Sequence, residues 1–205
     1  MSICKNLLIG LSGKMGSGKN YIAEKILPII LNKMITNIQY YYIAFGDQMK
    51  VEVGCRNKDL SYDSLFNEKT KEVRQMLQEY GTKNGRDKYG EDIWIRSLSL
   101  WMEIYKNRTP NKNNIFIVTD VRFKNEAQWI KQHDGILLRV NAPNRTVSRV
   151  KQEGSEDIQN HLSETDLDNY PFEYVINNDI EEQNNVLNKL REIAIKESKE
   201  RTNFA

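Results

Sequence analysis

The chain of 205 residues has few cysteines for disulfide bonds and lacks long apolar runs that could anchor it in a membrane. Its two cysteines, Cys4 and Cys55, lie far apart with no metal-ligand spacing, so we expect reduced thiols and no disulfide framework. No run of about eighteen apolar residues and no signal-peptide core is present. These absences predict a soluble, cytoplasmic protein without a membrane partner.

An excess of one charge sign is also lacking. Lysine and arginine total 30 against 28 aspartates and glutamates, which leaves a net charge of +2. Because the chain has no global basic field, acidic tail or base-reading module, its composition gives no support to a nucleic-acid partner. It contains no internal repeat, and its length suits one domain with a lid or a small insertion.

The most informative motif is the apolar run Leu7–Ser12, which breaks into a glycine, four residues and Gly-Lys. This spacing between a strand and a helix is typical of a phosphate-binding loop, where backbone N–H groups and a helix N-terminus converge on an anion. The motif predicts a nucleoside triphosphate ligand, and a glycine-rich turn is the alternative. The predicted binding residues are Gly13, Lys14, Gly16, Ser17, Gly18, Lys19 and Asn20.

Asn20 departs from the general motif, in which a Ser or Thr hydroxyl follows the lysine and holds Mg²⁺. An amide oxygen can also face a hard cation or its water shell. Magnesium binding is therefore expected to be altered rather than excluded, with Asn20 as a candidate ligand.

Strands alternate with helices along the rest of the chain. This alternation predicts an α/β, three-layer P-loop NTPase fold, in which helices flank a parallel sheet of about five strands. Residues 56–66 and 81–90 read as loops. The predicted strands are 7–12, 38–45, 115–118, 135–140 and 174–176, and the predicted helices are 21–33, with Pro28 as a kink, 49–53, 67–80, 93–106, 124–133 and 180–199.

Two charged residues follow the strand at 115–118, where the ligands of such sheets gather. Asp120 stands where a carboxylate would orient Mg²⁺ or its waters, and an N-cap on the next helix is its alternative. The planar fork of Arg122 suits phosphate, and its alternative is an ion pair with Glu126 four residues on.

Polar groups after the second and fourth strands add to this set. Asp47 is the candidate for positioning an acceptor or serving as a base, and Lys50 for binding its phosphate. Arg145 and Arg149 are four residues apart, so a helix would place both on one face of a lid that excludes water. A solvated basic helix is the alternative for this pair.

Further candidates lie in the helical region between the second and third strands. Arg74, Lys83 and Arg86 stand where small-molecule kinases often bind the acceptor. Trp94 is most simply a core or groove aromatic, with stacking on a base as the alternative. The segment His161–Glu164 fits either substrate contact or a capping turn before a short helix.

Several segments together resemble the bacteriophage-type deoxynucleoside monophosphate kinases. The most specific is Thr-Asp-Val-Arg-Phe-x-Asn-Glu at 119–126, and animal phosphomevalonate kinases resemble the same segments. Relatives often carry an acid after the loop lysine, so Asn20 is a smaller departure here. The other segments are 11–19, 44–50, 77–94, 161–164 and 174–178.

The resemblance implies that the chain transfers the γ-phosphoryl group of ATP, with Mg²⁺, to a deoxynucleoside 5′-monophosphate in deoxynucleotide metabolism. It implies one kinase domain over 1–205, an acceptor-binding insertion at 46–110 and a lid at 141–166. The location would be the host cytoplasm if the gene is viral, and a homodimer is left open. With the candidates above, the expected catalytic residues are Lys19, Asp47, Asp120, Arg122, Arg145 and Arg149; the acceptor-binding residues are Asp47, Lys50, Arg74, Trp94, Arg122, Glu126, His161 and Glu164; and the metal ligands are Asn20 and Asp120.

Two other functions stay open from the sequence. A kinase acting on phosphomevalonate would share the donor site and differ in the acceptor pocket. A nucleotide-dependent regulatory protein would use hydrolysis as a switch, although the chain has no Asn-Lys-x-Asp guanine-specificity sequence. The acids and arginines after the strands favour a second ligand and therefore an enzyme.

Overall fold

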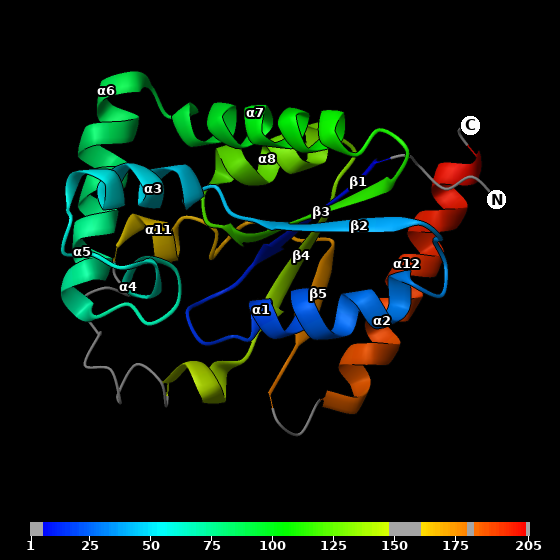
Figure 1. The fold of residues 1–205 in the computed structure, drawn as a ribbon. Helices are drawn as coiled ribbons and strands as arrows, with labels where there is room; N and C mark the ends of the chain where they lie inside the picture. The colour runs from blue at the N-terminus through cyan, green and yellow to red at the C-terminus, as the bar shows by residue number, and fades with distance from the viewer. Residues whose placement is uncertain (1–5, 148–160, 180–182, 204–205) are drawn as a thin grey trace.

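A computed structural model describes residues 6–147, 161–179 and 183–203 of the chain. Its centre is a five-stranded sheet in the order β2-β3-β1-β4-β5, and every neighbouring pair is parallel (Figure 1). The predicted α/β fold with a parallel sheet of about five strands is confirmed. The strands are β1 Asn6–Ser12, β2 Ile38–Ile43, β3 Asn113–Val121, β4 Ile136–Asn141 and β5 Tyr174–Asn177.

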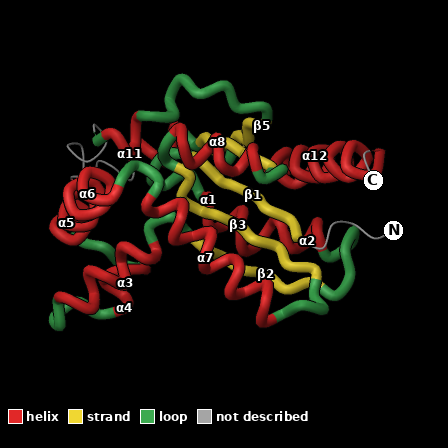
Figure 2. The backbone as a smooth tube through the Cα atoms, turned by 90° about the horizontal axis from the view of Figure 1, so that it is seen from above, coloured by secondary structure: helices red, strands yellow, loops and turns green. Residues whose placement is uncertain are grey.

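Helices cover both faces of this sheet, which gives three layers (Figures 1 and 2). Alternate residues of β1 point to opposite faces: Leu7, Ile9 and Leu11 pack on one side and Leu8 on the other. The first face is covered by the helical stretch 19–31 and by α12 (Gln183–Asn203), and the second by α7 (Ile93–Arg108) and α8 (Lys124–Gln132).

The helix after the phosphate loop passes through Pro28 with a local change of helical type. It consists of α1 (Lys19–Tyr21), the π-helical turn η1 (Ile22–Ile26) and α2 (Leu27–Leu31). Proline has no N–H to donate, and its ring crowds the carbonyl one turn earlier. A wider turn just before Pro28 relieves that conflict, so the helix is modified rather than cut.

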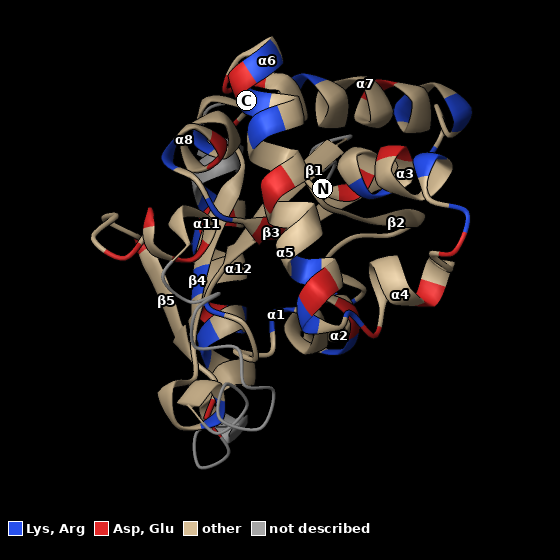
Figure 3. Ribbon diagram, turned by 90° about the vertical axis from the view of Figure 1, so that its left-hand side faces the viewer, with Lys and Arg blue, Asp and Glu red and all other residues tan. Residues whose placement is uncertain are grey.

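A helical region separates β2 from β3 in the chain and stands beyond the carboxyl ends of the strands. It packs around its own small core of Val53, Leu65, Val73 and Leu77. Its elements before α7 are α3 (Asp47–Arg56), α4 (Tyr62–Phe66), α5 (Lys71–Glu79), the π-helical η2 (Tyr80–Arg86) and α6 (Asp87–Tyr89). Figure 3 shows basic and acidic residues intermixed along these helices, in keeping with the balanced composition.

The loop predicted at 56–66 is wrong in its second half, where α4 forms. Ser61 begins that helix, and its hydroxyl accepts a hydrogen bond from the Ser64 amide at 3.2 Å. The helix is short and its one buried side chain is Leu65, so it shows no clear apolar period. A capping serine was the available signal.

The loop predicted at 81–90 is also wrong, because the helix of α5 continues through η2 and α6. Gly81 and Gly85 serve side-chain packing there instead of a chain reversal. A Cβ on Gly85 would lie 2.3 Å from the Trp94 ring, and the Trp94 indole donates to the Gly81 carbonyl at 3.0 Å. The chain turns at Gly90, whose φ of +94° suits glycine.

The remaining predicted elements are confirmed within a few residues. The strand predicted at 115–118 is longer, because pairing with β1 and β2 extends it to Asn113–Val121. Residues 180–182, the start of the last predicted helix, lie outside the described residues. In the described part of the chain, no helix is both long and apolar enough to span a bilayer.

Candidate active site

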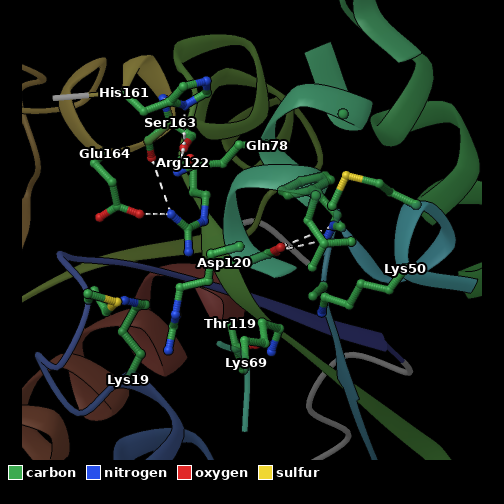
Figure 4. Close-up of a pocket in the computed structure, with 18 of the residues that line it drawn as sticks. Lys19, Lys50, Lys69, Gln78, Thr119, Asp120, Arg122, His161, Ser163 and Glu164 are labelled. Carbon is green, nitrogen blue, oxygen red and sulfur yellow. Dashed lines mark hydrogen bonds and ion pairs between the residues drawn. The ribbon is translucent and has the colours of Figure 1, made fainter. Parts of the chain in front are cut away.

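A cavity of about 1180 Å³ opens beyond the carboxyl ends of the strands (Figure 4). The phosphate loop lines one end of it, and the helical region lines the other. Between them lie the residues after β2 and β3 and the start of α11 (Leu162–Thr165). Arg145, after β4, also lines the cavity, which therefore joins polar residues that follow or end the first four strands.

The phosphate loop has the backbone conformation that its glycines allow. Gly13, Gly16 and Gly18 have φ values of +151°, +81° and +88°. A Cβ on Gly13 would lie 2.4 Å from the Val140 carbonyl oxygen, so the loop approaches β4 more closely than any side chain permits. The Lys19 ammonium donates to the Gly13 carbonyl at 2.6 Å and to the Lys14 carbonyl at 3.0 Å, which places it across the loop.

The end of the loop is fastened by two side chains from distant segments. The Ser17 carbonyl accepts hydrogen bonds from Arg145 Nη2 and from Asn178 Nδ2, both at 2.9 Å. Three polar atoms here are buried without a partner among the described residues: Ser17 Oγ, Arg145 Nε and Asn178 Oδ1. Because Arg145 also lines the cavity, its guanidinium fits contact with an anion bound in the loop.

Lys14 directs its ammonium out of the loop and toward α11. It donates to the Glu164 carbonyl and lies 2.7 Å from a carboxylate oxygen of Asp168. Lys14 does not line the cavity, and neither do Gly13 and Ser17. The expected part of Lys14 in binding ATP stays a prediction.

Asp120 joins the ends of β3 and β2. Its Oδ1 accepts the Phe45 N–H at 2.7 Å, and its Oδ2 accepts the Gly46 N–H at 3.0 Å. The alternative of Asp120 as a helix N-cap is wrong, since the N-cap residue of α8 is Phe123. Asp120 lines the cavity, so contact with a bound metal ion through water stays a prediction.

Asp47 holds Lys50 at the edge of the cavity. Its Oδ1 lies 2.8 Å from Lys50 Nζ, and its Oδ2 accepts the Ala44 N–H at 2.8 Å. Burial raises the pKa of Asp47; the Lys50 charge opposes that change, and the Asp120 charge adds to it. Lys50 lines the cavity and Asp47 does not. The contacts of Asp47 therefore position the Lys50 side chain.

The ion pair that the sequence offers between Arg122 and Glu126 is wrong. The Arg122 guanidinium pairs with Glu164 of α11, whose side chain is only 7% exposed. Glu126 pairs with Arg86, at 2.7 Å, and the Arg86 guanidinium lies 3.5 Å above the Phe123 ring. Arg122 thus lies in the cavity wall and is bound to α11, to which Lys14 also donates a hydrogen bond.

Glu126 is buried, at 2% exposure, and its contacts are internal. Its Oε2 accepts the N–H groups of Arg122 at 2.8 Å and Phe123 at 3.1 Å, so it caps the start of α8. Burial raises its pKa to about 7; the Asp120 charge adds to this change and the Arg86 charge opposes it. These contacts position the Arg122 turn, and a direct contact with an acceptor stays a prediction.

Other predicted acceptor residues also line the cavity. His161 is the N-cap of α11, as in its capping alternative, because its Nδ1 accepts the Ser163 N–H at 3.2 Å. Burial, and then the Arg122 charge, lower the pKa of His161. Trp94 is 5% exposed, packed in the core with one side in the cavity wall, and Arg74 lines the cavity from α5.

Both predicted metal ligands, Asn20 and Asp120, line the cavity, and their contact with Mg²⁺ stays a prediction. Asn20 is exposed at the loop end of the cavity. Within residues 6–147, 161–179 and 183–203, no three His, Cys, Asp or Glu side chains cluster closely enough to hold an ion. Arg149, the second predicted lid arginine, lies outside the described residues.

One lysine in the cavity wall was missed from the sequence. Lys69 lies between α4 and α5, beside the predicted Arg74. Burial, and then the charges of Lys50, Arg74 and Arg122, lower the pKa of Lys69 to about 8. The available signal was a basic residue in the polar break before the helix carrying Arg74. Lys83, by contrast, is exposed and pairs with Glu79 at 2.6 Å.

Known proteins match the chain over most of its length. A family model described as phosphomevalonate kinase matches residues 11–135. A protein of Acanthamoeba polyphaga mimivirus, provisionally named a deoxynucleotide monophosphate kinase, is 28% identical over 156 residues, which cover 67% of this chain and 75% of that protein. The solved shikimate kinase of Bacteroides thetaiotaomicron gives a TM-score of 0.42 at 16% identity, covering 92% of this chain and 98% of that one. Both families that the motifs resemble thus recur among the matches.

The buried carboxyl of Glu126 gives the stability of the protein a pH dependence. Its pKa is raised from 4.5 to about 7 by folding, so its contribution is fully present below pH 4.5 and is lost as the pH rises through about 7. As the pH rises from about 5 to 8, the free energy of unfolding of the wild type should fall by on the order of 3 kcal/mol through this carboxyl. Glu126→Gln should not show that fall. Urea titrations of both proteins across that range measure the difference. Glu103→Gln, an exposed change on α7, should keep the wild-type slope, and equal slopes for Glu126→Gln and wild type would refute the assignment.

Proposed function

The chain belongs to the phosphomevalonate kinase family and is a small-molecule kinase, and on that premise we propose that it phosphorylates a deoxynucleoside 5′-monophosphate with ATP. The product would be the diphosphate. The name of the mimivirus relative supports this acceptor class. The insertion at 46–110 would bind the acceptor. The segment 141–166, of which 148–160 lie outside the described residues, would close over the transferred group.

The observation that carries this proposal is one cavity with two cationic ends. The loop end holds Lys19 and Arg145. The opposite end holds Lys50, Lys69 and Arg74, with Arg122 in the wall. A polyphosphate donor and a phosphorylated acceptor can therefore occupy the same enclosure, which is the arrangement that phosphoryl transfer needs.

The size and lining of the cavity favour an acceptor with a planar base. A volume of about 1180 Å³ exceeds the range of about 300–1,000 Å³ that one small ligand usually fills. The aromatic side chains of Phe66, Trp94 and Phe123 reach the acceptor end, and the amides of Asn67 and Gln78 lie beside them. Rings that can stack and amides that can read base edges suit a nucleobase.

The residues present fit an ATP phosphate chain. The start of the helix at Gly18 has no side-chain cap, as expected where an anion takes that position. Lys19 and Arg145 would neutralise the charge of the outer phosphates. Mg²⁺, when bound, shields the charge on the phosphates, and Asn20 and Asp120 would hold it through its waters.

The acceptor side needs positioning more than proton removal. The second pKa of a phosphate monoester is about 6, so its attacking oxygen is already ionised near neutral pH. Arg122 and Lys50 would orient that phosphate, with Glu164 and Asp47 holding their side chains in place. Asp47 would thus act through Lys50, and no general base is required.

Phosphomevalonate is the second candidate acceptor. The family description favours it, and so does the number of cations at the acceptor end, because phosphomevalonate carries a carboxylate as well as a phosphate. Its aliphatic body leaves the aromatic lining without a planar partner.

A panel of acceptors with ATP and Mg²⁺ tests the proposed function. Deoxynucleoside and ribonucleoside 5′-monophosphates and phosphomevalonate would be incubated separately, and the products read by mass. We expect a deoxynucleoside diphosphate to form. Phosphorylation of phosphomevalonate with no nucleotide turnover would overturn the proposal in favour of the second candidate.

Removing the Lys19 charge should slow phosphoryl transfer. Lys19→Ala should lower kcat by at least about 100-fold, which is on the order of 3 kcal/mol of transition-state stabilisation. Steady-state kinetics measure this loss. Lys25→Ala changes an exposed lysine later in the same helical stretch and should retain wild-type kcat. Near-normal turnover of Lys19→Ala would remove Lys19 from the proposed mechanism.

Arg122 should act on the acceptor rather than on ATP. Arg122→Ala should raise the acceptor KM by about 10-fold or more and leave the ATP KM within about 2-fold, because a charged hydrogen bond contributes about 1.5–3 kcal/mol. Substrate titrations give both constants. The double variant Arg122→Ala/Glu164→Gln avoids leaving the buried Glu164 charge unpaired, so the same result in both variants excludes a folding defect. Loss of ATP binding instead would assign Arg122 to the donor.

A further inference from the structure

Lys69 places a positive charge in the cavity wall, where burial and neighbouring cations disfavour the charged form of its side chain. It lies in the link between α4 and α5, and its ammonium donates to the Phe66 carbonyl at 2.9 Å. Figure 4 shows Lys69 and Lys50 reaching into the same cavity. Among the described residues, Lys69 has no carboxylate partner in an ion pair, whereas Lys50 is paired with Asp47 and Arg122 with Glu164.

The surroundings of Lys69 are strongly cationic. Lys50 of α3, Arg74 of α5 and Arg122 after β3 all repel its charge, and the Asp47 carboxylate partly opposes them. Burial disfavours the charged ammonium further. A group of like charges held in a partly buried site is stabilised when an anion binds among them.

We propose that Lys69, with Lys50 and Arg74, binds the phosphate of the acceptor and sets the preference of this end of the cavity for phosphorylated compounds. The inference rests on the proposed function and deepens it, because it names the residue that completes the acceptor-phosphate site. It applies equally to a nucleoside monophosphate and to phosphomevalonate.

The competing interpretation gives Lys69 a structural role only. Phe66 is the last residue of α4, so the hydrogen bond to its carbonyl resembles a cation at a helix C-terminus. An amide can make that bond without a charge, which allows the two roles to be separated. Lys69→Gln keeps a donor for the Phe66 carbonyl and removes the ammonium.

Titration with inorganic phosphate tests the site without an identified acceptor. The protein would be saturated with ADP and Mg²⁺ to fill the donor end, and phosphate binding would be measured by calorimetry. Lys69→Gln should weaken phosphate binding by at least about 10-fold, the loss expected for one charge-assisted contact. Lys58→Gln, which changes an exposed lysine after α3, should bind phosphate as the wild type does.

Kinetics separate acceptor binding from a general defect. Lys69→Gln should raise the acceptor KM by at least about 10-fold and leave the ATP KM within about 2-fold, with an unchanged melting temperature. Unchanged phosphate affinity and unchanged acceptor KM would overturn the proposal. Equal loss for both substrates together with a lower melting temperature would assign Lys69 to folding.

The pH profile supplies a signature that a structural role lacks. Deprotonation of Lys69 above about pH 8 should raise the acceptor KM of the wild type. Lys69→Arg keeps its charge over this range, so its acceptor KM should stay flat. Because Lys50, Asp47, Arg74 and Arg122 are common to both proteins, the comparison isolates Lys69. Identical pH profiles of the wild type and Lys69→Arg would overturn the proposal. This comparison does not need Lys69→Gln to fold.

Failure of this inference can be told apart from failure of the proposed function. If no nucleotide is phosphorylated, the phosphate titration still decides the role of Lys69. If nucleotides are phosphorylated and Lys69→Gln has wild-type constants, the proposed function stands and the role of Lys69 fails alone.

Discussion

The close approach of the phosphate loop to the ends of β4 and β5 is the constraint on which the site depends. Gly13 lies so near the Val140 carbonyl that no Cβ fits between them, and Asn178 and Arg145 both bind the Ser17 carbonyl. The loop is thus held by the sheet and by the segment after β4 before any ligand binds. That rigidity lets one lysine, Lys19, lie across the loop at a fixed place.

The segment α11 links the two ends of the cavity through one residue. The carbonyl of Glu164 accepts from Lys14 of the phosphate loop, and its carboxylate pairs with Arg122 of the acceptor side. Gln78 of α5 also contacts this segment, through Ser163. A displacement of α11, which lies within the segment 141–166 proposed as a lid, would therefore change both ends together.

Much of the fold could be predicted because its signals are local. The glycine spacing at 13–19, the unbroken apolar run Ile115–Val118 and the alternation of strands and helices each depend on neighbours in sequence. The helical region was harder, because Gly81 and Gly85 have the composition of a turn. Gly85 admits the Trp94 ring and the Gly81 carbonyl accepts the Trp94 N–H, and both contacts exist only after α7 has folded against η2.

By itself, the amino-acid sequence determined the phosphate loop, the parallel sheet and the placing of Asp47, Asp120 and Arg122 at or just beyond the carboxyl ends of strands. The tertiary structure decided which charges meet: Glu126 with Arg86, Arg122 with Glu164, and Lys69 with three other cations. The reason is physical. Backbone conformation follows from residues a few positions apart, whereas burial and charge pairing join side chains that the sequence separates by tens of residues.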